Sequence, residues 1–391
     1  MPCVTARWRR LPISLPAPLR RKRRSGLGER FDIAIVGAGM AGASLGAELA
    51  PHASILMLEA EDRPGYHATG RSAAFWEECY GGPEVVPLTL ASGPYLRDHG
   101  FLRRRGAVYV GRGSDAGALD AFVERFRARG ATIERIGREV LEAHIPGLRP
   151  AWTGGVWEPA CSDIDVAGLH AHYLARFARA GGTLRTRGRV ERLDRTGDGW
   201  VVAAAGAEFQ AALLVNAAGA WADGIAALAG VPAVGISPLR RTVVQLRVAP
   251  SPPDDMPLVL DIEGGFYFRP ENGRLWLSPQ DETPSAPCDA APEELAVAEA
   301  IDRLQQVVDW RVEAVERKWA GLRSFAPDRR PIYGFDPADP SLFWFAGQGG
   351  FGIQTAPAAA RLGAQLLLGA SRDGMTAGLD PELYSPARFR P

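Results

Sequence analysis

Three glycines and one glutamate near the start of the chain have the types and spacing that bind a ligand carrying phosphates. Gly37, Gly39 and Gly42 form a GxGxxG pattern, and Glu59 lies 22 residues after Gly37. Glycines permit a tight turn and a close approach of the backbone to a pyrophosphate, while a helix that begins there offers unpaired N–H groups. A carboxylate at this spacing accepts hydrogen bonds from a ribose hydroxyl. The pattern predicts a dinucleotide site, and a glycine-rich turn without a ligand is the alternative.

The stretches around these residues predict the βαβ unit that such a site needs. Residues 32–36 and 55–58 are apolar and typical of buried strands, and residues 40–50 between them are rich in Ala, Leu and Glu, which favours a helix. Gly42 lets that helix pack closely on the first strand. Residues 213–221 repeat the arrangement of a buried strand that runs into a turn of small residues. We expect this second turn to face the same ligand.

The remainder of the chain changes character at Ser237. Before it, periodicity and turn residues predict mainly helices and short strands. After it, longer alternating strands predict an antiparallel sheet, with a hairpin turn at Glu271-Asn272-Gly273. Helices are predicted over residues 116–129, 165–180, 223–229, 292–308 and 356–368. The sequence therefore predicts an α/β (α+β) protein of two interleaved domains.

Composition argues against several classes of protein. The 391 residues contain 45 Lys+Arg and 45 Asp+Glu, so no overall field attracts nucleic acid or an anionic membrane. The four cysteines, Cys3, Cys79, Cys161 and Cys288, form no CxxC pattern. This argues against a disulfide framework or a zinc site and fits a reducing cytoplasm. We expect no metal, no nucleic-acid partner and no integral membrane segment.

The first 29 residues form a basic extension. Residues 1–28 contain no acid but eight Lys or Arg, which predicts disorder. An export signal built on Arg9-Arg10 is an alternative, although the apolar residues 11–19 are few and are broken by three prolines. Contact of this extension with nucleic acid or a membrane is another alternative. We expect a cytoplasmic protein and leave peripheral membrane contact open.

Four motifs, taken together and in order, resemble the D-amino-acid-oxidase-type (DAO) family of FAD-dependent oxidoreductases. They are Gly37–Gly42 with Glu59, Gly65–Ala74 (GYHATGRSAA), Asn216–Trp221 (NAAGAW) and Gly347–Gln354 (GQGGFGIQ). The likeness runs from Phe31 to the C-terminus, and within the family it is strongest to the bacterial D-arginine dehydrogenases.

The resemblance implies non-covalently bound FAD and a fold of two domains. A Rossmann-like FAD-binding domain of glutathione-reductase type would comprise residues 30–102, 158–236 and 320–391. A mostly antiparallel substrate domain would comprise residues 103–157 and 237–319. The implied FAD contacts are Gly37, Gly39, Met40, Ala41, Gly42, Glu59, Ala60, His67, Thr69, Arg71, Ser72, Ala73, Ala74, Val190, Ala217, Ala218, Gly219, Trp221, Arg323, Gly347, Gly349, Gly350, Gly352, Ile353 and Gln354.

Five residues match positions that bind or activate the substrate in this family. Arg241 and Arg323 match arginines that hold a substrate carboxylate, and Tyr267 matches a tyrosine that adds a hydrogen bond. Gln354 and His67 match residues beside the flavin ring and the substrate amine. A planar guanidinium binds a carboxylate through two parallel hydrogen bonds, which fixes its orientation. The alternatives are internal ion pairs for the arginines, sheet packing for the tyrosine and packing on the flavin for the histidine.

The resemblance implies oxidation of a small amino acid by hydride transfer from the α-carbon to flavin N5, with a quinone or dioxygen as the electron acceptor. D-Arginine dehydrogenases have a glutamate after the segment that matches Gly100-Phe101, and it meets the cationic side chain of the substrate. Here residues 102–106 are shorter and basic, whereas Leu258 and Leu260 suggest an apolar wall. We therefore expect a neutral or hydrophobic D-amino acid that is converted to an imino acid.

Other functions stay open at this point. A related flavoenzyme would act on glycine, sarcosine, proline or a 2-hydroxy acid. A non-catalytic FAD-binding assembly or electron-transfer protein would bind FAD without reacting with amino acids. A nicotinamide dehydrogenase is disfavoured by the motifs at residues 216–221 and 347–354. Stereospecificity, the electron acceptor and the oligomeric state are not determined by the sequence.

Overall fold

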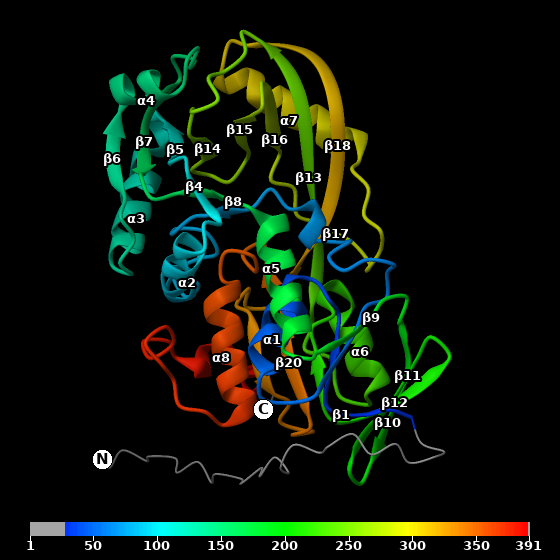
Figure 1. Cartoon of the computed structure of the whole chain (residues 1–391). Helices are drawn as coiled ribbons and strands as arrows, with labels where there is room; N and C mark the ends of the chain where they lie inside the picture. The colour runs from blue at the N-terminus through cyan, green and yellow to red at the C-terminus, as the bar shows by residue number, and fades with distance from the viewer. Residues whose placement is uncertain (1–27, 390–391) are drawn as a thin grey trace, which may run out of the picture.

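The computed structural model describes residues 28–389. The basic extension predicted for residues 1–29 lies outside the described part, except for its last two residues. Within residues 28–389 the strands form an eight-stranded sheet, a ten-stranded sheet and a small three-stranded sheet. The eight-stranded sheet occupies the lower half of the molecule and the ten-stranded sheet the upper half (Figure 1).

The lower sheet is built around the predicted βαβ unit. This unit is formed by β1 (Arg30–Val36), α1 (Met40–Leu49) and β2 (Ile55–Leu58), which confirms the prediction. β1 lies between β2 and β12 (Ala207–Asn216) and is parallel to both. The end of β12 also pairs in parallel with β20 (Leu342–Ala346). The carboxyl ends of these four strands therefore lie at one edge of the sheet.

Further strands extend this sheet on both sides. β9 (Thr183–Arg185) pairs with β2, and β19 (Ile332–Phe335) pairs with β20. The first half of β12 pairs with β11 (Gly199–Ala204), which pairs in turn with β10 (Val190–Thr196). We predicted a buried strand that begins at residue 213, whereas β12 begins at Ala207 and is continuous, because no turn residue interrupts it.

Helices cover both faces of the lower sheet. α1, α5 (Val166–Arg179) and α8 (Ala356–Leu368) pack against one another on one face, and α6 (Ala222–Leu228) packs on the other. Gly46 lets α1 pack closely on β2, since a Cβ there would lie 2.5 Å from the Met57 Cε.

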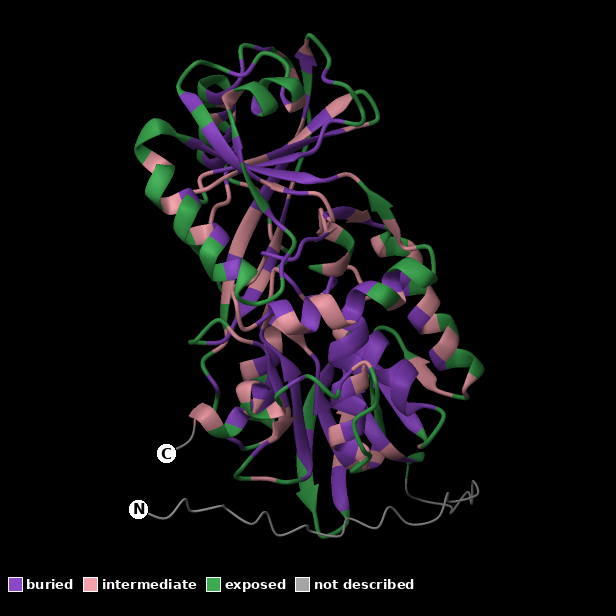
Figure 2. Ribbon diagram, turned by 90° about the vertical axis from the view of Figure 1, so that its left-hand side faces the viewer, coloured by how far each residue is buried: buried purple, intermediate pink, exposed green. Residues whose placement is uncertain are grey.

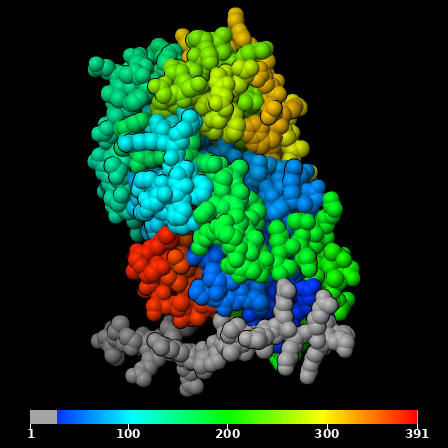
Figure 3. Space-filling view, viewed as in Figure 1, coloured from blue at the N-terminus to red at the C-terminus, as the bar shows by residue number. Residues whose placement is uncertain are grey.

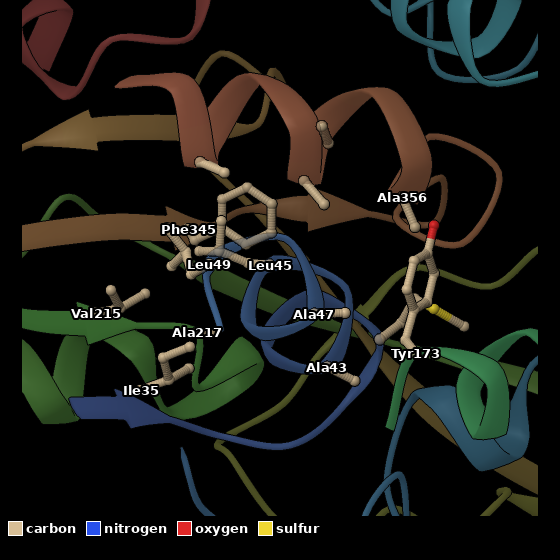
Figure 4. Packing of buried hydrophobic residues seen from close by; sticks show 14 of the residues in the cluster. Ile35, Ala43, Leu45, Ala47, Leu49, Tyr173, Val215, Ala217, Phe345 and Ala356 are labelled. Carbon is tan, nitrogen blue, oxygen red and sulfur yellow. The ribbon is translucent and has the colours of Figure 1, made fainter. Parts of the chain in front are cut away.

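The core between these elements is apolar and contains many small side chains. Leu45 and Leu49 of α1 lie beside Phe345, with Ile35 and Val215 of the sheet beneath them (Figure 4). All five are at most 1% exposed. Burial of such side chains contributes ~1.5–3 kcal/mol each, so this core fixes the edge of the sheet at which the glycine motif lies.

The upper sheet is mostly antiparallel, as predicted. Its strands in spatial order are β21 (Gln348–Gly349), β18 (Arg311–Phe325), β13 (Ser237–Ala249), β16 (Arg274–Ser278), β15 (Tyr267–Glu271), β14 (Leu258–Asp261), β5 (Ala107–Arg112), β7 (Trp152–Glu158) and β6 (Glu134–Gly137), and β17 (Thr283–Pro284) pairs with β13. Only β14 and β5 among these neighbours run parallel. The β15–β16 hairpin turns at Asn272-Gly273, both with positive φ, as the sequence predicts.

Three helices pack on this sheet. They are α3 (Ala116–Arg127), α4 (Arg138–His144) and α7 (Glu294–Val307). Exposed residues lie on the outer sides of helices, whereas the strands of both halves are largely buried (Figure 2). Among residues 28–389, no helix combines the length and the apolar character that a bilayer crossing requires.

A small sheet and one helix lie between the two halves. The sheet consists of β3 (Phe75–Trp76), β8 (Ser162–Ile164) and β4 (Leu102–Arg104). α2 (Val86–Asp98) covers the same region on the face shown in Figure 3. These elements close one side of the space between the sheets.

The sequence did not predict the longest strand, β18. Five of the eight residues from Arg311 to Lys318 are charged, and most of this part is exposed, so no apolar pattern marks it. Pairing with β13 over its whole length holds it in the sheet. β18 also crosses the boundary that we predicted between residues 319 and 320, and the domain limits stay a prediction.

Candidate functional site

A cavity of about 650 Å³ lies between the two large sheets. Its lower wall is formed at the carboxyl ends of β1, β2 and β12, and its upper wall by one face of β13, β18 and β14. In open α/β sheets ligands bind outside the carboxyl ends of the strands, so this is the expected place for the predicted site.

The glycine motif forms a cradle that leaves no room for side chains. Gly37 has φ of +101°, and a Cβ there would lie 2.5 Å from the Ala217 carbonyl oxygen. A Cβ on Gly42 would lie 1.9 Å from the Gly37 carbonyl oxygen. Gly37, Gly39, Met40 and Ala41 line the cavity, whereas Gly42 does not and instead permits close packing of α1 on β1. The start of α1 thus faces the cavity as a phosphate site requires.

Glu59 is buried at the end of β2 and lines the cavity. Its Oε2 accepts a hydrogen bond from the Ala38 N–H at 2.9 Å, and its Oε1 accepts one from the Glu61 N–H at 3.0 Å. Each carboxylate oxygen retains a further lone pair. The side chain is therefore held in place with acceptors left for ribose hydroxyls.

The second motif, Gly65–Ala74, connects the glycine cradle to the upper sheet. The Thr69 hydroxyl accepts a hydrogen bond from the Met40 N–H at 2.9 Å. Arg71 Nη1 donates to the Ala290 carbonyl at 2.8 Å and to the Ala320 carbonyl at 3.3 Å. The predicted contacts of this segment that line the cavity are His67, Thr69, Arg71, Ser72, Ala73 and Ala74, and the predicted contact Ala60, which follows Glu59, also lines it.

His67 lines the cavity near the cradle. Its Nε2 lies 3.0 Å from the Glu61 Oε1, and its ring packs on Trp221 with 4.6 Å between centroids. None of the contacts recorded for its ring in the described chain involves Arg241 or Arg323. The structure thus places His67, which matches a family residue beside the flavin ring and the substrate amine, next to an acid and an aromatic ring of the cofactor cradle.

Most remaining predicted cofactor contacts also line the cavity. They are Val190, Ala217, Ala218, Gly219, Trp221, Arg323, Gly349, Gly350, Gly352 and Ile353. Gly347 does not line it.

Gln354 also lies outside the cavity wall. It is 1% exposed, and its Nε2 donates to the Thr89 Oγ1 at 2.8 Å and to the Glu77 carbonyl at 3.2 Å, while its Oε1 accepts from the Glu77 N–H at 3.2 Å. This side chain is fully engaged within the protein, so the structure does not bring it to the substrate position that we predicted for it.

Arg241 and Arg323 lie on one face of the upper sheet. Arg241 is opposite Gly321 across the β13–β18 ladder, and Arg323 is opposite Leu239, so the arginines are diagonal neighbours. Gly321 places no side chain beside them, and all three residues line the cavity. Burial and the nearby Arg323 charge lower the pKa of Arg241.

One carboxylate, Glu282, lies beside both arginines. Its Oε1 is 2.6 Å from the Arg323 Nη2 and 3.6 Å from the Arg241 Nη2, and Arg329 Nη2 donates to it at 2.8 Å. Burial acts against ionisation of Glu282, but the hydrogen bond from Arg329 and the charge of Arg323 lower its pKa.

One of the three guanidinium nitrogens of Arg323 has no partner in the described chain. Its Nη1 donates to the Tyr80 hydroxyl, and its Nη2 pairs with Glu282. Its Nε is buried and has no hydrogen-bond partner in the described chain. Arg323 itself lines the cavity, so the part of its guanidinium group that faces the cavity is available to a ligand.

The rest of the upper wall is apolar. Leu258 and Leu260 of β14 line the cavity together with Tyr109 and Phe122. Tyr267 lies at the start of β15 and also lines it, and burial raises the pKa of its hydroxyl although Arg241 acts in the opposite sense. The apolar wall that we predicted from Leu258 and Leu260 is therefore present in the structure.

Several residues of the site were not predicted from the sequence. Among those with polar groups are Glu77 and Tyr80, which line the cavity, and Asp281 and Glu282, which contact its arginines. Two consecutive acids, Glu77-Glu78, shortly after a small-residue motif were an available signal for the first of these residues. No signal in the sequence pointed to Glu282, because its contact with the two arginines depends on the register of β18 against β13.

Comparison with known proteins identifies the family. Residues 32–366 match the family model described as DAO, FAD dependent oxidoreductase. Glycine oxidase from Geobacillus kaustophilus is 26% identical over 358 residues, which cover 86% of this chain and 93% of that protein. L-2-Hydroxyglutarate dehydrogenase from Caenorhabditis elegans is 25% identical over 283 residues, which cover 64% of this chain and 63% of that protein.

Solved structures show the same fold. L-Proline dehydrogenase from P. horikoshii matches with a TM-score of 0.81 and 20% identity, covering 93% of this chain and 98% of the other. L-α-Glycerophosphate oxidase from Mycoplasma pneumoniae with FAD bound matches with a TM-score of 0.79 and 17% identity, covering 87% and 95%. The fold class predicted from the sequence is thereby confirmed, and the cradle described above fits FAD through its glycines and Glu59. The chain belongs to the DAO family of FAD-dependent oxidoreductases.

Proposed function

We propose that this protein oxidises a small amino acid at its α-carbon. The observation that carries the proposal is the pair Arg241 and Arg323, which are diagonal neighbours across the β13–β18 ladder and both line the cavity. Two guanidinium groups on one face match a carboxylate, which is the group that amino acids share. FAD, when bound, supplies the group that accepts a hydride from the substrate.

The residues of the chain contribute binding and orientation. The arginines fix the carboxylate, and Tyr267 beside them can donate a hydrogen bond. Holding the substrate in one orientation next to the cofactor supplies most of the rate gain expected for such a reaction. The leucines and aromatic residues of the upper wall exclude water from the reacting centre.

The wall also supports a neutral or hydrophobic substrate. The basic residues that stand where D-arginine dehydrogenases have an acid are engaged internally, because Arg103 and Arg105 both pair with Asp163 at 2.9 Å. No carboxylate occurs among residues 102–106 to meet a guanidinium group there. We infer a preference for neutral or hydrophobic D-amino acids, and the resemblance to D-arginine dehydrogenases stays a prediction.

The relatives support a substrate of this class and also offer a second candidate. Glycine oxidase and L-proline dehydrogenase are named for amino acids. L-2-Hydroxyglutarate dehydrogenase is named for a 2-hydroxy acid, which the arginine pair would also accept. The acceptor, quinone or dioxygen, and a cytoplasmic location stay predictions.

Anaerobic bleaching of the bound flavin tests the proposal. D-Leu, D-Met and D-Phe should bleach it faster than their L-forms and faster than D-Arg. Faster bleaching by D-Arg would overturn the apolar preference, and bleaching by 2-hydroxy acids alone would select the second candidate. A flavoprotein that bleaches with neither class would contradict the proposal. Repeating the reaction in air with peroxide detection distinguishes dioxygen from a quinone.

A further inference from the structure

Two buried acids beside the cavity, Glu77 and Glu158, have no part in the chemistry described so far. Glu77 directly follows β3, is 3% exposed and lines the cavity. Glu158 ends β7 and is 0% exposed. The Glu77 Oε1 and the Glu158 Oε2 are buried and have no hydrogen-bond partner in the described chain.

No cation of the described chain pairs with these acids. The other titratable groups around them are Glu78, Cys79, Cys161, Asp163 and Arg105. The one cation among these, Arg105, has its Nε 2.9 Å from both oxygens of Asp163. Burial and the charge of Glu158 raise the pKa of Glu77, and burial raises the pKa of Glu158 to about 8.

Such an arrangement is costly unless a ligand uses it. Burying a carboxyl group without a partner is unfavourable, and two neighbouring carboxyl groups cannot both ionise there easily. No group of residues within 28–389 is arranged to hold a metal ion, so a metal does not explain the pair. Without a ligand the raised pKa values keep the pair protonated, and a positively charged organic group in the cavity would favour the ionised form of Glu77.

The segment that carries Glu77 connects it to the substrate wall. Phe75, two residues earlier, packs edge-on against Tyr267 with 6.2 Å between ring centroids. Tyr80, three residues later, accepts a hydrogen bond from Arg323. The Gln354 amide holds the backbone N–H and carbonyl of Glu77, each at 3.2 Å. Glu77 is therefore fixed on a short segment whose two ends contact the carboxylate-binding residues.

We propose that Glu77, supported by Glu158, is a cation subsite that binds a protonated amino group of the ligand held by Arg241 and Arg323. The proposal rests on the proposed function, because it takes the arginine pair as the carboxylate site. Such a ligand carries a carboxylate, which would pair with the arginines, and an ammonium group, which would pair with Glu77. The ammonium group is either the α-amino group, in which case the preference for neutral or hydrophobic side chains stands, or an amine on the side chain, in which case a basic substrate replaces that preference.

Two matched pairs of non-reacting ligands test the subsite on the FAD-loaded protein. 2-Aminoisobutyrate has no α-hydrogen and differs from pivalate by an ammonium group in place of a methyl group. 6-Aminohexanoate differs from heptanoate in the same way at the far end of the chain. Their dissociation constants are measured by titrating the flavin absorbance spectrum or by calorimetry, with no turnover required.

We expect the amine member of at least one pair to bind about tenfold more tightly than its amine-free partner to the wild-type protein. Glu77→Gln should remove this difference and leave pivalate and heptanoate within about twofold. If Glu77→Gln weakens the binding of 2-aminoisobutyrate, the subsite binds the α-amino group. If it weakens the binding of 6-aminohexanoate, the subsite binds a side-chain amine. Equal binding within both pairs to the wild-type protein overturns the proposal, even if the variant does not fold.

A neighbouring acid supplies the matched control. Glu78 accepts a hydrogen bond from the Thr132 N–H at 2.6 Å and does not line the cavity. Glu78→Gln should leave all four dissociation constants unchanged, and an effect equal to that of Glu77→Gln would also overturn the subsite. If no amino acid bleaches the flavin but the Glu77-dependent difference is found, the proposed reaction fails while the subsite stands.

Discussion

Replacing Arg323 by lysine tests whether the arginine pair binds a carboxylate. Arg323 and Arg329 both donate to the Glu282 Oε1, at 2.6 Å and 2.8 Å. Only Arg323 lines the cavity, whereas the Arg329 side chain is 52% exposed. Glu282 keeps a partner in either variant, so neither should unfold the protein. Arg329→Lys is therefore a control that alters the same ion pair away from the cavity.

The expected magnitude follows from the geometry of Arg323. Its Nη1 donates to Tyr80 and its Nη2 donates to Glu282, and each of these nitrogens retains a second N–H that a ligand in the cavity can accept. Lysine keeps the charge but lacks the planar fork, so the hydrogen bond from these nitrogens is lost. A hydrogen bond to a charged group contributes ~1.5–3 kcal/mol, and 1.36 kcal/mol corresponds to a tenfold change. Because the side chain is only 13% exposed, solvent screens this bond little.

We therefore expect Arg323→Lys to raise the dissociation constant of pivalate by ~10- to 150-fold. Titration of the flavin spectrum measures it without turnover. KM for an amino acid that bleaches the flavin should rise by a similar factor. The same increase in Arg329→Lys, or a change below about twofold in Arg323→Lys, would refute the assignment of this pair as the carboxylate site.

Three further predictions concern the cradle, the arginine wall and the acid pair. Gly37→Ala places a Cβ 2.5 Å from the Ala217 carbonyl oxygen, so the protein should purify without flavin absorbance. Gly350→Ala places a Cβ 2.0 Å from the Tyr80 hydroxyl, so pivalate affinity should fall about tenfold while FAD is retained. Burial raises the pKa of Glu158 from 4.5 to about 8, so the free energy of unfolding should fall as pH rises from 5 to 8, and Glu158→Gln should flatten this dependence in denaturant titrations.

Each of these predictions has a control and a contrary outcome. Gly374→Ala introduces a Cβ with nothing within 4 Å and should change neither flavin content nor affinity. Full flavin content in Gly37→Ala would contradict the close approach of the backbone to the phosphates. The free energy of unfolding should fall with rising pH because the raised pKa of Glu158 means that the folded state binds the proton more tightly than the unfolded state does. An unfolding free energy that rises over this pH range would show that the pair is ionised in the folded protein.

Local patterns predicted the cofactor half of the site well. The turn at Gly37 and the acid at Glu59 belong to one βαβ unit, so their geometry is set within 30 residues of chain. Arg241 and Arg323 were identified through resemblance to a family rather than through spacing. Their juxtaposition depends on β18, which the sequence did not mark as a strand.

Long-range burial was not predictable from the same patterns. Nothing near Glu77 in the sequence indicates that it lies beside Glu158, because the small sheet and β7 bring the two segments together. Gln354 was assigned to the substrate for its place in the last glycine-rich motif. Its amide instead binds the backbone at Glu77, since that buried backbone needs partners that no strand supplies.

The last motif and the segment 75–80 therefore act on the same part of the site. Gly349 and Gly350 line the cavity at the beginning of the loop, and Gln354 at its end holds Glu77 in place. The loop formed by this motif thus connects the cofactor-facing wall of the cavity to Glu77, the acid that we propose binds the amino group of the ligand.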